Sequence, residues 1–417
     1  MWTLRFIPFA LLALSGFAQG FSIDSEFELT QRNAFRVAED ERLSQNKQTG
    51  SIELSGSPNY STSFTVIGRA SFDHYYDQER FNDSEVDDHK SETELREAYV
   101  DYFIDNFTIR LGKQQVTWGE SDYFRVVDLV HSLDLRDFLL PYAENFQEAR
   151  NTLNMMNIMH QGDIWETQLL FIPDFQQDTL PSPSADFSPI AYTQLNEQLG
   201  MPEHSTPDAK IDNAAWGFSA KGVFDMGDLG FYGYSGWNGD GTLRLSNSGP
   251  VFDYQRRQFI GTSFSAPVGA FVLRTDIAHR FNERLNAQLG SGLPYVEKDV
   301  NEILMGLDYS HASFNSSVQL VHRKVMDHES TVSVSPESNS FSIYISQELL
   351  GDRLKLSYLM LGESDDFNGL NEARMSYQFH DQVIGTIGVN WFEGDIDTTY
   401  GQFDQQDRIF TGLKLFL

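Results

Sequence analysis

The sequence contains no cysteine in its 417 residues. This absence excludes disulfide bridges, metal sites built on thiolates and a lipid anchor attached to an N-terminal cysteine. Whatever fold the chain adopts must therefore be stabilised without covalent cross-links between side chains.

Long apolar stretches are also scarce. Residues 1–20 carry Arg5, an apolar stretch over 6–14 and then small residues, which is the pattern of a secretory signal with cleavage near residues 18–20. No later stretch approaches the roughly 18 apolar residues that a membrane-spanning helix needs. A secreted chain of this kind can still cross a membrane as a closed β-barrel, because such a barrel pairs its backbone polar groups between strands.

Positive charge is in short supply. Lys and Arg number 30 against 60 Asp and Glu, which gives a formal net charge of −30. Such a balance excludes nucleic acid as an expected partner. Aromatic residues are plentiful, with 33 Phe, 17 Tyr and 6 Trp, as the aromatic girdles of a membrane barrel require.

Signatures of catalysis and of metal binding are missing. There is no G-x-S-x-G, no H-E-x-x-H and no glycine loop of the kind that binds phosphate. The histidines that could act as bases are His74, His279, His322 and His380. No serine is placed beside them by the sequence, and the acidic loops lack the spacing of a calcium site. We therefore expect no enzyme activity, no cofactor and no metal site.

The dominant positive feature is a two-residue period. Leu354, Leu356 and Tyr358 alternate with Lys355 and Ser357, and similar segments recur to the last residue. Successive side chains of a strand point to opposite faces, so each segment has one apolar and one polar face. In a membrane barrel the apolar face turns toward lipid and the polar face toward the lumen.

Eighteen such segments are predicted. They begin near residues 24, 49, 61, 93, 106, 150, 163, 212, 227, 251, 268, 300, 313, 339, 352, 370, 382 and 404. Short turns alternate with long polar connections, as expected when both chain ends lie in the periplasm. The predicted fold is an all-β transmembrane antiparallel β-barrel over residues 21–417, with 18 strands, or 16 if one hairpin is misassigned.

Two long connections stand out. In the connection over 120–149, apolar residues recur at helical spacing, and Tyr123 and Val126 are examples. Such a segment either lies on the outer surface or folds into the lumen. Because it is too apolar to lie in water, we predict a helical segment folded into the lumen. The connection over 175–211 is rich in proline, and we predict a long extracellular loop that covers the mouth of the barrel.

A signature surrounds the first of these connections. It reads R-L-G-K-Q at 110–114, T-W-G-E-S-D at 117–122 and D-L-R-D-F at 134–138. This pattern resembles a family of Gram-negative outer-membrane β-barrels of unknown function, close to the alginate-export-type porins. The resemblance implies an outer-membrane pore or transport component, and it implies an association with RND-type exporters of the inner membrane.

Candidate lumenal residues follow from the signature and from strand alternation. The predicted constriction and lumen residues are Trp118, Glu120, Asp122, Arg125, Asp128, Arg136 and Asp137, with Arg69, Arg274, Arg323 and Arg374 on the wall. We expect Trp118 to anchor the turn at the rim and Arg125 to pair with Asp128 or Asp134. The signature residues then either form a constriction that selects the solute or only stabilise the loop. Charge facing lipid costs ~2–4 kcal/mol for Arg or Lys near the midplane, which favours the inward assignment. The wall residues could guide an anionic solute, or they could pair with acids on neighbouring strands.

The predicted function is an outer-membrane channel that passes a polar or amphiphilic solute, in the outer membrane after signal removal. The alternative is a plugged barrel that acts as a surface receptor or structural partner, and a barrel-embedded hydrolase is the weakest candidate. Expected partners are outer-membrane lipid, lipopolysaccharide, an RND-type exporter and the barrel-assembly machinery. The last is expected because alternate residues from Ile409 to Leu417 resemble the C-terminal signal that this machinery recognises.

Overall fold

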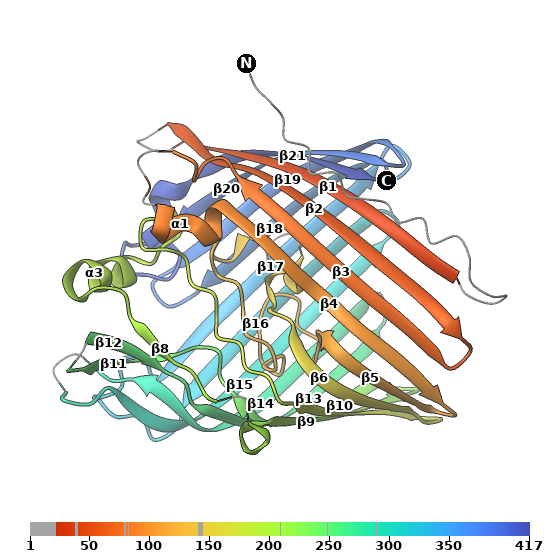
Figure 1. Ribbon diagram of the computed structural model, residues 1–417, viewed down its shortest axis with the longest axis horizontal. Helices are drawn as coiled ribbons and strands as arrows, with labels where there is room; N and C mark the ends of the chain where they lie inside the picture. The colour runs from red at the N-terminus through yellow and green to blue at the C-terminus, as the bar shows by residue number, and fades with distance from the viewer. Residues whose placement is uncertain are drawn as a thin grey trace.

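The computed structural model describes residues 22–37, 41–78, 81, 83–140, 145–208, 210–247, 249–288 and 291–417. The predicted signal peptide lies outside these residues. The described strands form an 18-stranded antiparallel sheet that closes on itself. A separate three-stranded sheet lies at one end of the barrel (Figure 1). The predicted fold class and the count of 18 wall strands are confirmed.

The wall strands are β1 (Ser22–Arg36), β2 (Arg42–Asn59), β3 (Thr62–Asp73), β4 (Ser91–Ile104), β5 (Phe107–Gln114), β6 (Leu153–Gln161), β7 (Trp165–Ile172), β9 (Ala215–Phe224), β10 (Gly227–Trp237), β13 (Arg256–Val268), β14 (Phe271–Asn286), β15 (Tyr295–His311), β16 (Phe314–Val325), β17 (Glu337–Leu349), β18 (Leu354–Glu363), β19 (Asn368–His380), β20 (Val383–Glu393) and β21 (Arg408–Phe416). The largest difference from the predicted starts is at β2, which was expected near residue 49. A polar run at 44–48 hides the alternation there.

Ring closure joins the two ends of the chain. β1 pairs with β2 on one side and with β21 on the other, in a register that sets Glu28 opposite Phe416 and Arg36 opposite Arg408. Because the first and last wall strands pair, the barrel has no free edge whose backbone groups would face hydrocarbon.

Two helices and a small sheet gather at the end of the barrel where the long connections lie, at the left of Figure 1. They are α1 (Asp83–Lys90), α3 (Ile190–Leu199) and the sheet of β8 (Glu203–Ser205), β11 (Thr242–Ser246) and β12 (Gly249–Asp253). The 3-10 helices of the described chain are η1 (Phe146–Ala149), η2 (Ile211–Asn213) and η3 (Gly401–Gln406). Among the described residues, no helix has the length and apolar character needed to span a membrane.

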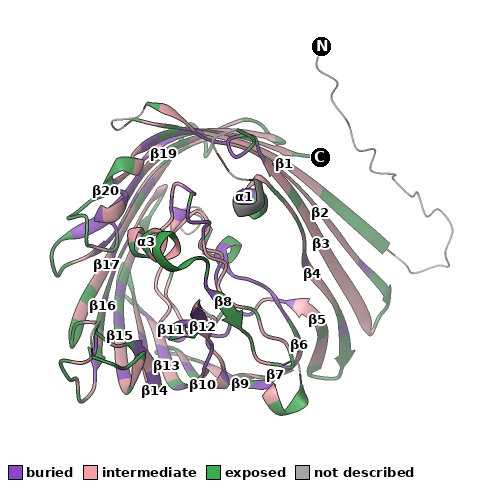
Figure 2. Cartoon of the chain, turned by 60° about the vertical axis from the view of Figure 1, so that its left-hand side comes forward, coloured by how far each residue is buried: buried purple, intermediate pink, exposed green. Residues whose placement is uncertain are grey.

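The two faces of the wall differ as the alternation predicts. On the outer face, Met305 is 60% exposed and its cross-strand partner Leu320 is 59% exposed. On the inner face, the adjacent Gln319 and Leu304 are fully buried. Burial of inward residues means that the lumen is occupied at this level, and Figure 2 shows connecting segments lying within the ring of strands.

Two connections account for this filling. The insert, residues 115–152, joins β5 to β6, and the strap, residues 173–189, joins β7 to α3. Residues 141–144 of the insert lie outside the described part. Apolar residues of the insert pack against inward residues of the wall, so the segment folds into the lumen as expected.

The predicted helical conformation of the segment 120–149 is wrong in its described part. Residues 120–139 contain no helix, and within the described part of the segment only Leu140 and η1 at its end are helical. The adjacent Val126 and Val127 are both fully buried, which one face of an amphipathic helix would not achieve. Several backbone N–H groups of the insert bond to wall and loop side chains, and these bonds replace those of a helix.

The lipid-facing assignment can be tested with one charge. Leu320→Arg places a guanidinium on the outer face midway along β16, and we expect the free energy of unfolding to fall by about 2–4 kcal/mol. Ile211→Arg is the control, because Ile211 is 79% exposed in η2 outside the wall. Urea unfolding in phospholipid bilayers measures both changes. Equal effects of the two substitutions would contradict the assignment of faces.

Candidate constriction site

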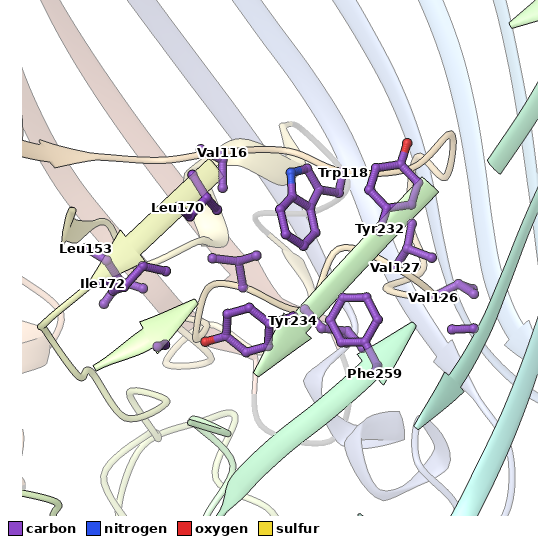
Figure 3. Close-up of a cluster of buried hydrophobic side chains, with 14 of the residues drawn as sticks. Val116, Trp118, Val126, Val127, Leu153, Leu170, Ile172, Tyr232, Tyr234 and Phe259 are labelled. Atoms are coloured by element: carbon purple, nitrogen blue, oxygen red, sulfur yellow. The ribbon is translucent and has the colours of Figure 1, made fainter. Parts of the chain in front are cut away.

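The insert sits on an apolar patch of the inner wall. Its residues Trp118, Val126 and Val127 pack with the inward side chains Leu304 of β15 and Phe259 of β13 (Figure 3). Apolar residues on both faces of a wall strand, as in the run 169–172, are the sequence signal of such a patch. Most lumen-facing positions of a water-filled barrel are polar, so an apolar inner position predicts a covering segment.

Trp118 fixes the beginning of the insert. Its indole Nε1 donates a hydrogen bond to Gln168 Oε1 at 2.8 Å, and its ring lies 5.6 Å from the ring of Tyr232. A methyl group at Gly217 would approach the indole to 2.9 Å, so glycine permits this close approach. The predicted role of Trp118 as an anchor agrees with these contacts, although it anchors inside the wall rather than at the rim.

Gly119 permits the turn that follows. Its φ of +84° is strained for other residues, and a Cβ there would lie 2.4 Å from Val127 and 2.7 Å from an Asp276 carboxylate oxygen. Asp276, on β14, accepts hydrogen bonds from the backbone N–H of Glu120 at 3.0 Å and of Ser121 at 3.2 Å. The Asp276 carboxylate thus binds two backbone N–H groups of the insert, as a capping side chain does at the start of a helix.

Asp122 is held by the same part of the wall. Its carboxylate accepts from Arg274 of β14 at 2.6 Å and from Gln319 Nε2 of β16 at 3.1 Å. Arg274 also donates to the carbonyl of Glu120 at 2.7 Å and to Asp308 of β15 at 2.7 Å. The insert is therefore tied directly to β14 and β16, and Arg274 is itself paired with β15.

A buried ion pair links two parts of the insert. Arg150 donates to Asp128 Oδ2 at 2.6 Å, and the two side chains are 3% and 6% exposed. Arg125 donates to the backbone carbonyl of Asp128 at 2.8 Å and to the carbonyl of His131. Arg125 therefore binds carbonyls rather than the carboxylates of Asp128 or Asp134, with which pairing was expected.

His131 is a neutral member of this network. Its Nε2 accepts the N–H of Val116 at 2.9 Å, so Nδ1 carries the proton and donates to the carbonyl of Asn151 at 2.8 Å. Burial lowers the pKa of His131 to about 4. Burial likewise raises the pKa of Glu120, and the charges of Lys221 and Arg274 oppose that rise.

Arg136 and Asp137 lie at the far side of the insert. Arg136 pairs with Asp134 at 2.6 Å and with Glu92 at 2.7 Å, which ties the insert to the start of β4. Asp137 lies 3.8 Å from Lys47 on β2. These two residues therefore belong to the long-loop end of the barrel rather than to the group around Asp276.

The predicted wall arginines interact with different neighbouring residues. Arg69 bridges Glu94 of β4 at 3.0 Å and Glu148 of the insert at 2.5 Å. Arg374 pairs with Glu372 on its own strand at 2.8 Å. Arg323 lies near Arg280 and Glu302 in a mixed cluster of charges. Pairing with nearby acids therefore describes Arg69 and Arg374 better than an unpaired basic ladder.

The structure brings Glu120 and Asp122 together with Arg274, and joins Arg125 to Asp128. Trp118 lies instead against Gln168 and Tyr232. It does not bring Arg323 or Arg374 into the hydrogen bonds of the insert among the described residues. Gln319, His131 and Arg150 were missed, because nothing in their local sequence distinguishes them from ordinary wall or loop residues. Asp276 was recognisable only as an inward acid.

Comparison with known proteins places this geometry in context. A family model described as "Protein of unknown function (DUF1302)" matches residues 16–414. Comparison with curated proteins gives no match. The solved structure of OccAB1 from Acinetobacter baumannii is similar with a TM-score of 0.54 at 12% identity, covering 97% of each chain.

OccK2 (OpdF) from Pseudomonas aeruginosa, solved in complex with glucuronate, is similar with a TM-score of 0.53 at 11% identity. This match covers 95% of the present chain and 96% of that one. At these identities the likeness concerns the fold. The chain has the fold of a porin-like outer-membrane β-barrel.

The buried ion pair gives a test of how the insert is held. Asp128→Asn leaves the Arg150 guanidinium buried without its carboxylate, so we expect the free energy of opening the insert to fall by about 3–5 kcal/mol. The matched control is Asp253→Asn, which removes the partly exposed pair with Arg244 and should cost less than about 1 kcal/mol. Hydrogen–deuterium exchange of residues 115–139 measures the opening. Equal protection in the two variants would contradict the proposed restraint.

Acidification should loosen the insert through His131. Its pKa is about 4 when buried and about 6.5 when exposed, so the folded insert disfavours the protonated form. Stability is therefore intact above pH 6.5 and falls by about 3 kcal/mol as the pH drops to 4. Exchange of residues 115–139, corrected for intrinsic rates, measures this loss. His131→Gln keeps both hydrogen bonds without a titrating group, and an unchanged pH profile in that variant would refute the role of His131.

Proposed function

This chain belongs to the family described as "Protein of unknown function (DUF1302)", and we propose that it is an outer-membrane channel whose constriction is formed by the insert. The barrel supplies the passage, because 18 strands enclose a lumen too wide to be filled by wall side chains alone. The insert narrows that lumen. The proposed location, the outer membrane, follows from the porin-like fold and the apolar outer face.

One observation carries this proposal: the insert is fastened to opposite sides of the ring. Near its start, Asp276 and Arg274 of β14 hold the backbone of Glu120. Farther along, Asp137 lies by Lys47 of β2, which is about half-way round the ring from β14. A segment held at both sides by charged groups keeps a fixed width, as a selective constriction requires.

The charges at the constriction favour a polar or amphiphilic solute. Glu120 and Asp122 of the insert lie near Lys221 and Arg274 of the wall, so both signs of charge face the passage. A solute would exchange water for weak contacts with these groups and cross without an energy source of its own. Coupling to an RND-type exporter is the finer part of the proposal, and the family resemblance alone supports it.

Single-channel conductance in planar bilayers tests the channel. We expect the intact barrel to conduct weakly and a variant that lacks 121–147 to conduct several-fold more, because the constriction is gone. The control variant lacks residues 242–253, which form the β11–β12 hairpin of the small three-stranded sheet, and it should conduct like the intact barrel. If the intact barrel is already as open as the deletion variant, the insert is not the constriction. If neither conducts, the barrel is plugged and a receptor or structural role replaces the channel.

A further inference from the structure

A cavity of about 530 Å³ lies at the long-loop end of the barrel. We call it the strap pocket, because residues 173–182 of the strap line it, together with residues from α1, the insert, α3, β8 and the end of β10. Its volume lies within the range of roughly 300–1,000 Å³ typical of small-molecule sites. None of the lining residues holds the insert to β14.

The pocket has an aromatic wall. The Phe175 ring lies 6.2 Å from the ring of Trp237, and Tyr192 and His204 add further ring surface to the lining. The Trp237 indole donates to the carbonyl of Asn213 at 2.7 Å, which fixes its orientation. One face of Trp237 already carries the Arg256 guanidinium, 5.4 Å from the ring centre.

Two acids of the strap, Asp174 and Asp178, are among the lining residues and have no cationic partner in the described chain. Asp174 accepts from the side-chain amide of Asn154 at 2.7 Å and from the N–H of Phe175 at 2.9 Å. Asp178 accepts from the N–H of Leu133 at 2.8 Å. These donors are neutral, and neither acid forms an ion pair within the part of the chain that the structure describes.

Arg136 and His89 of the lining do not offset these acids. Arg136 is already paired with Asp134 and Glu92. The Nε2 of His89 accepts the N–H of Ser182 at 2.9 Å, and burial lowers the pKa of His89 to about 4, so this ring is neutral. The pocket therefore combines negative charge with aromatic surface.

We propose that the strap pocket binds an organic cation, such as a quaternary ammonium or protonated amine with an aromatic body. The cation would lie against the rings of Phe175 and Tyr192 and close to Asp174 and Asp178. An aromatic ring face attracts a cation through its quadrupole, and the attraction is stronger when the cation is removed from water. An anion of the same size would be repelled by the two carboxylates, and a neutral ligand would lack the charge–charge attraction to them.

The pocket touches the insert through the strap. The backbone carbonyl of Thr179 accepts from the N–H of Leu135 at 2.8 Å, and the Thr179 N–H donates to the carbonyl of Leu133 at 2.8 Å. A bound ligand would therefore rest on a strand of chain that pairs with the insert. This proposal concerns a ligand-binding site and does not depend on the channel. Binding is measured without conductance, so a positive or a negative binding result leaves the channel proposal unaffected.

Isothermal titration of the full-length barrel in detergent micelles tests the charge preference. Benzyltrimethylammonium is the probe, and benzyl alcohol and phenylacetate are its neutral and anionic counterparts. We expect saturable binding of the cation, binding at least tenfold weaker for the alcohol and none for phenylacetate. Equal affinity for cation and anion, or no saturable binding of the cation up to about 10 mM, would overturn the proposal.

Two variants locate the binding. Asp174→Asn with Asp178→Asn removes charge but keeps acceptor oxygens, and we expect the affinity for benzyltrimethylammonium to fall about tenfold. The matched control is Asp365→Asn with Asp366→Asn, an acidic pair between β18 and β19 outside the pocket, and it should bind like the unmodified chain. Equal losses in the two double variants would place the cation elsewhere on this acidic protein and refute the site.

Discussion

The need to pair every backbone polar group within the membrane governs this structure. It forces β1 against β21, and the closed ring then fixes which face of each strand meets lipid. Outward positions become apolar and inward positions are free to be polar or to receive another segment. The insert depends on this ring, because its partners come from β4, β7, β14 and β16, which only closure brings around one space.

Within the lumen, apolar packing and polar bonds have different consequences. Val126, Val127 and Phe259 remove apolar surface from water, which favours docking without specifying one position. Asp276 and Arg274 specify the position, since their bonds form only where Glu120 and Asp122 arrive in the right register. Buried ion pairs such as Arg150–Asp128 add little net stability, because desolvation offsets their attraction. Losing one partner is nevertheless costly, which makes the position of the insert sensitive to single substitutions.

Strand positions were predictable because strand period and membrane thickness are local properties of the sequence. All 18 segments were found, and the largest shift, at β2, arose where 44–48 carry no apolar alternation. The helix predicted around Tyr123 was wrong, because helical spacing assumes that backbone groups bond within the segment. In the folded chain Asp276 binds the N–H groups of Glu120 and Ser121 instead, and Asp178 binds that of Leu133.

The sequence by itself determined the barrel, a strand count of 18 or 16, the orientation of the faces and the segment that enters the lumen. Each of these follows from composition and from periods of a few residues. Only the tertiary structure decided which charged groups meet. Glu120 and Asp276 are 156 residues apart, and no local period encodes their contact. The strap pocket is likewise assembled from α1, the strap, α3 and Trp237, which come together only after the ring has closed and its long connections have folded over one end.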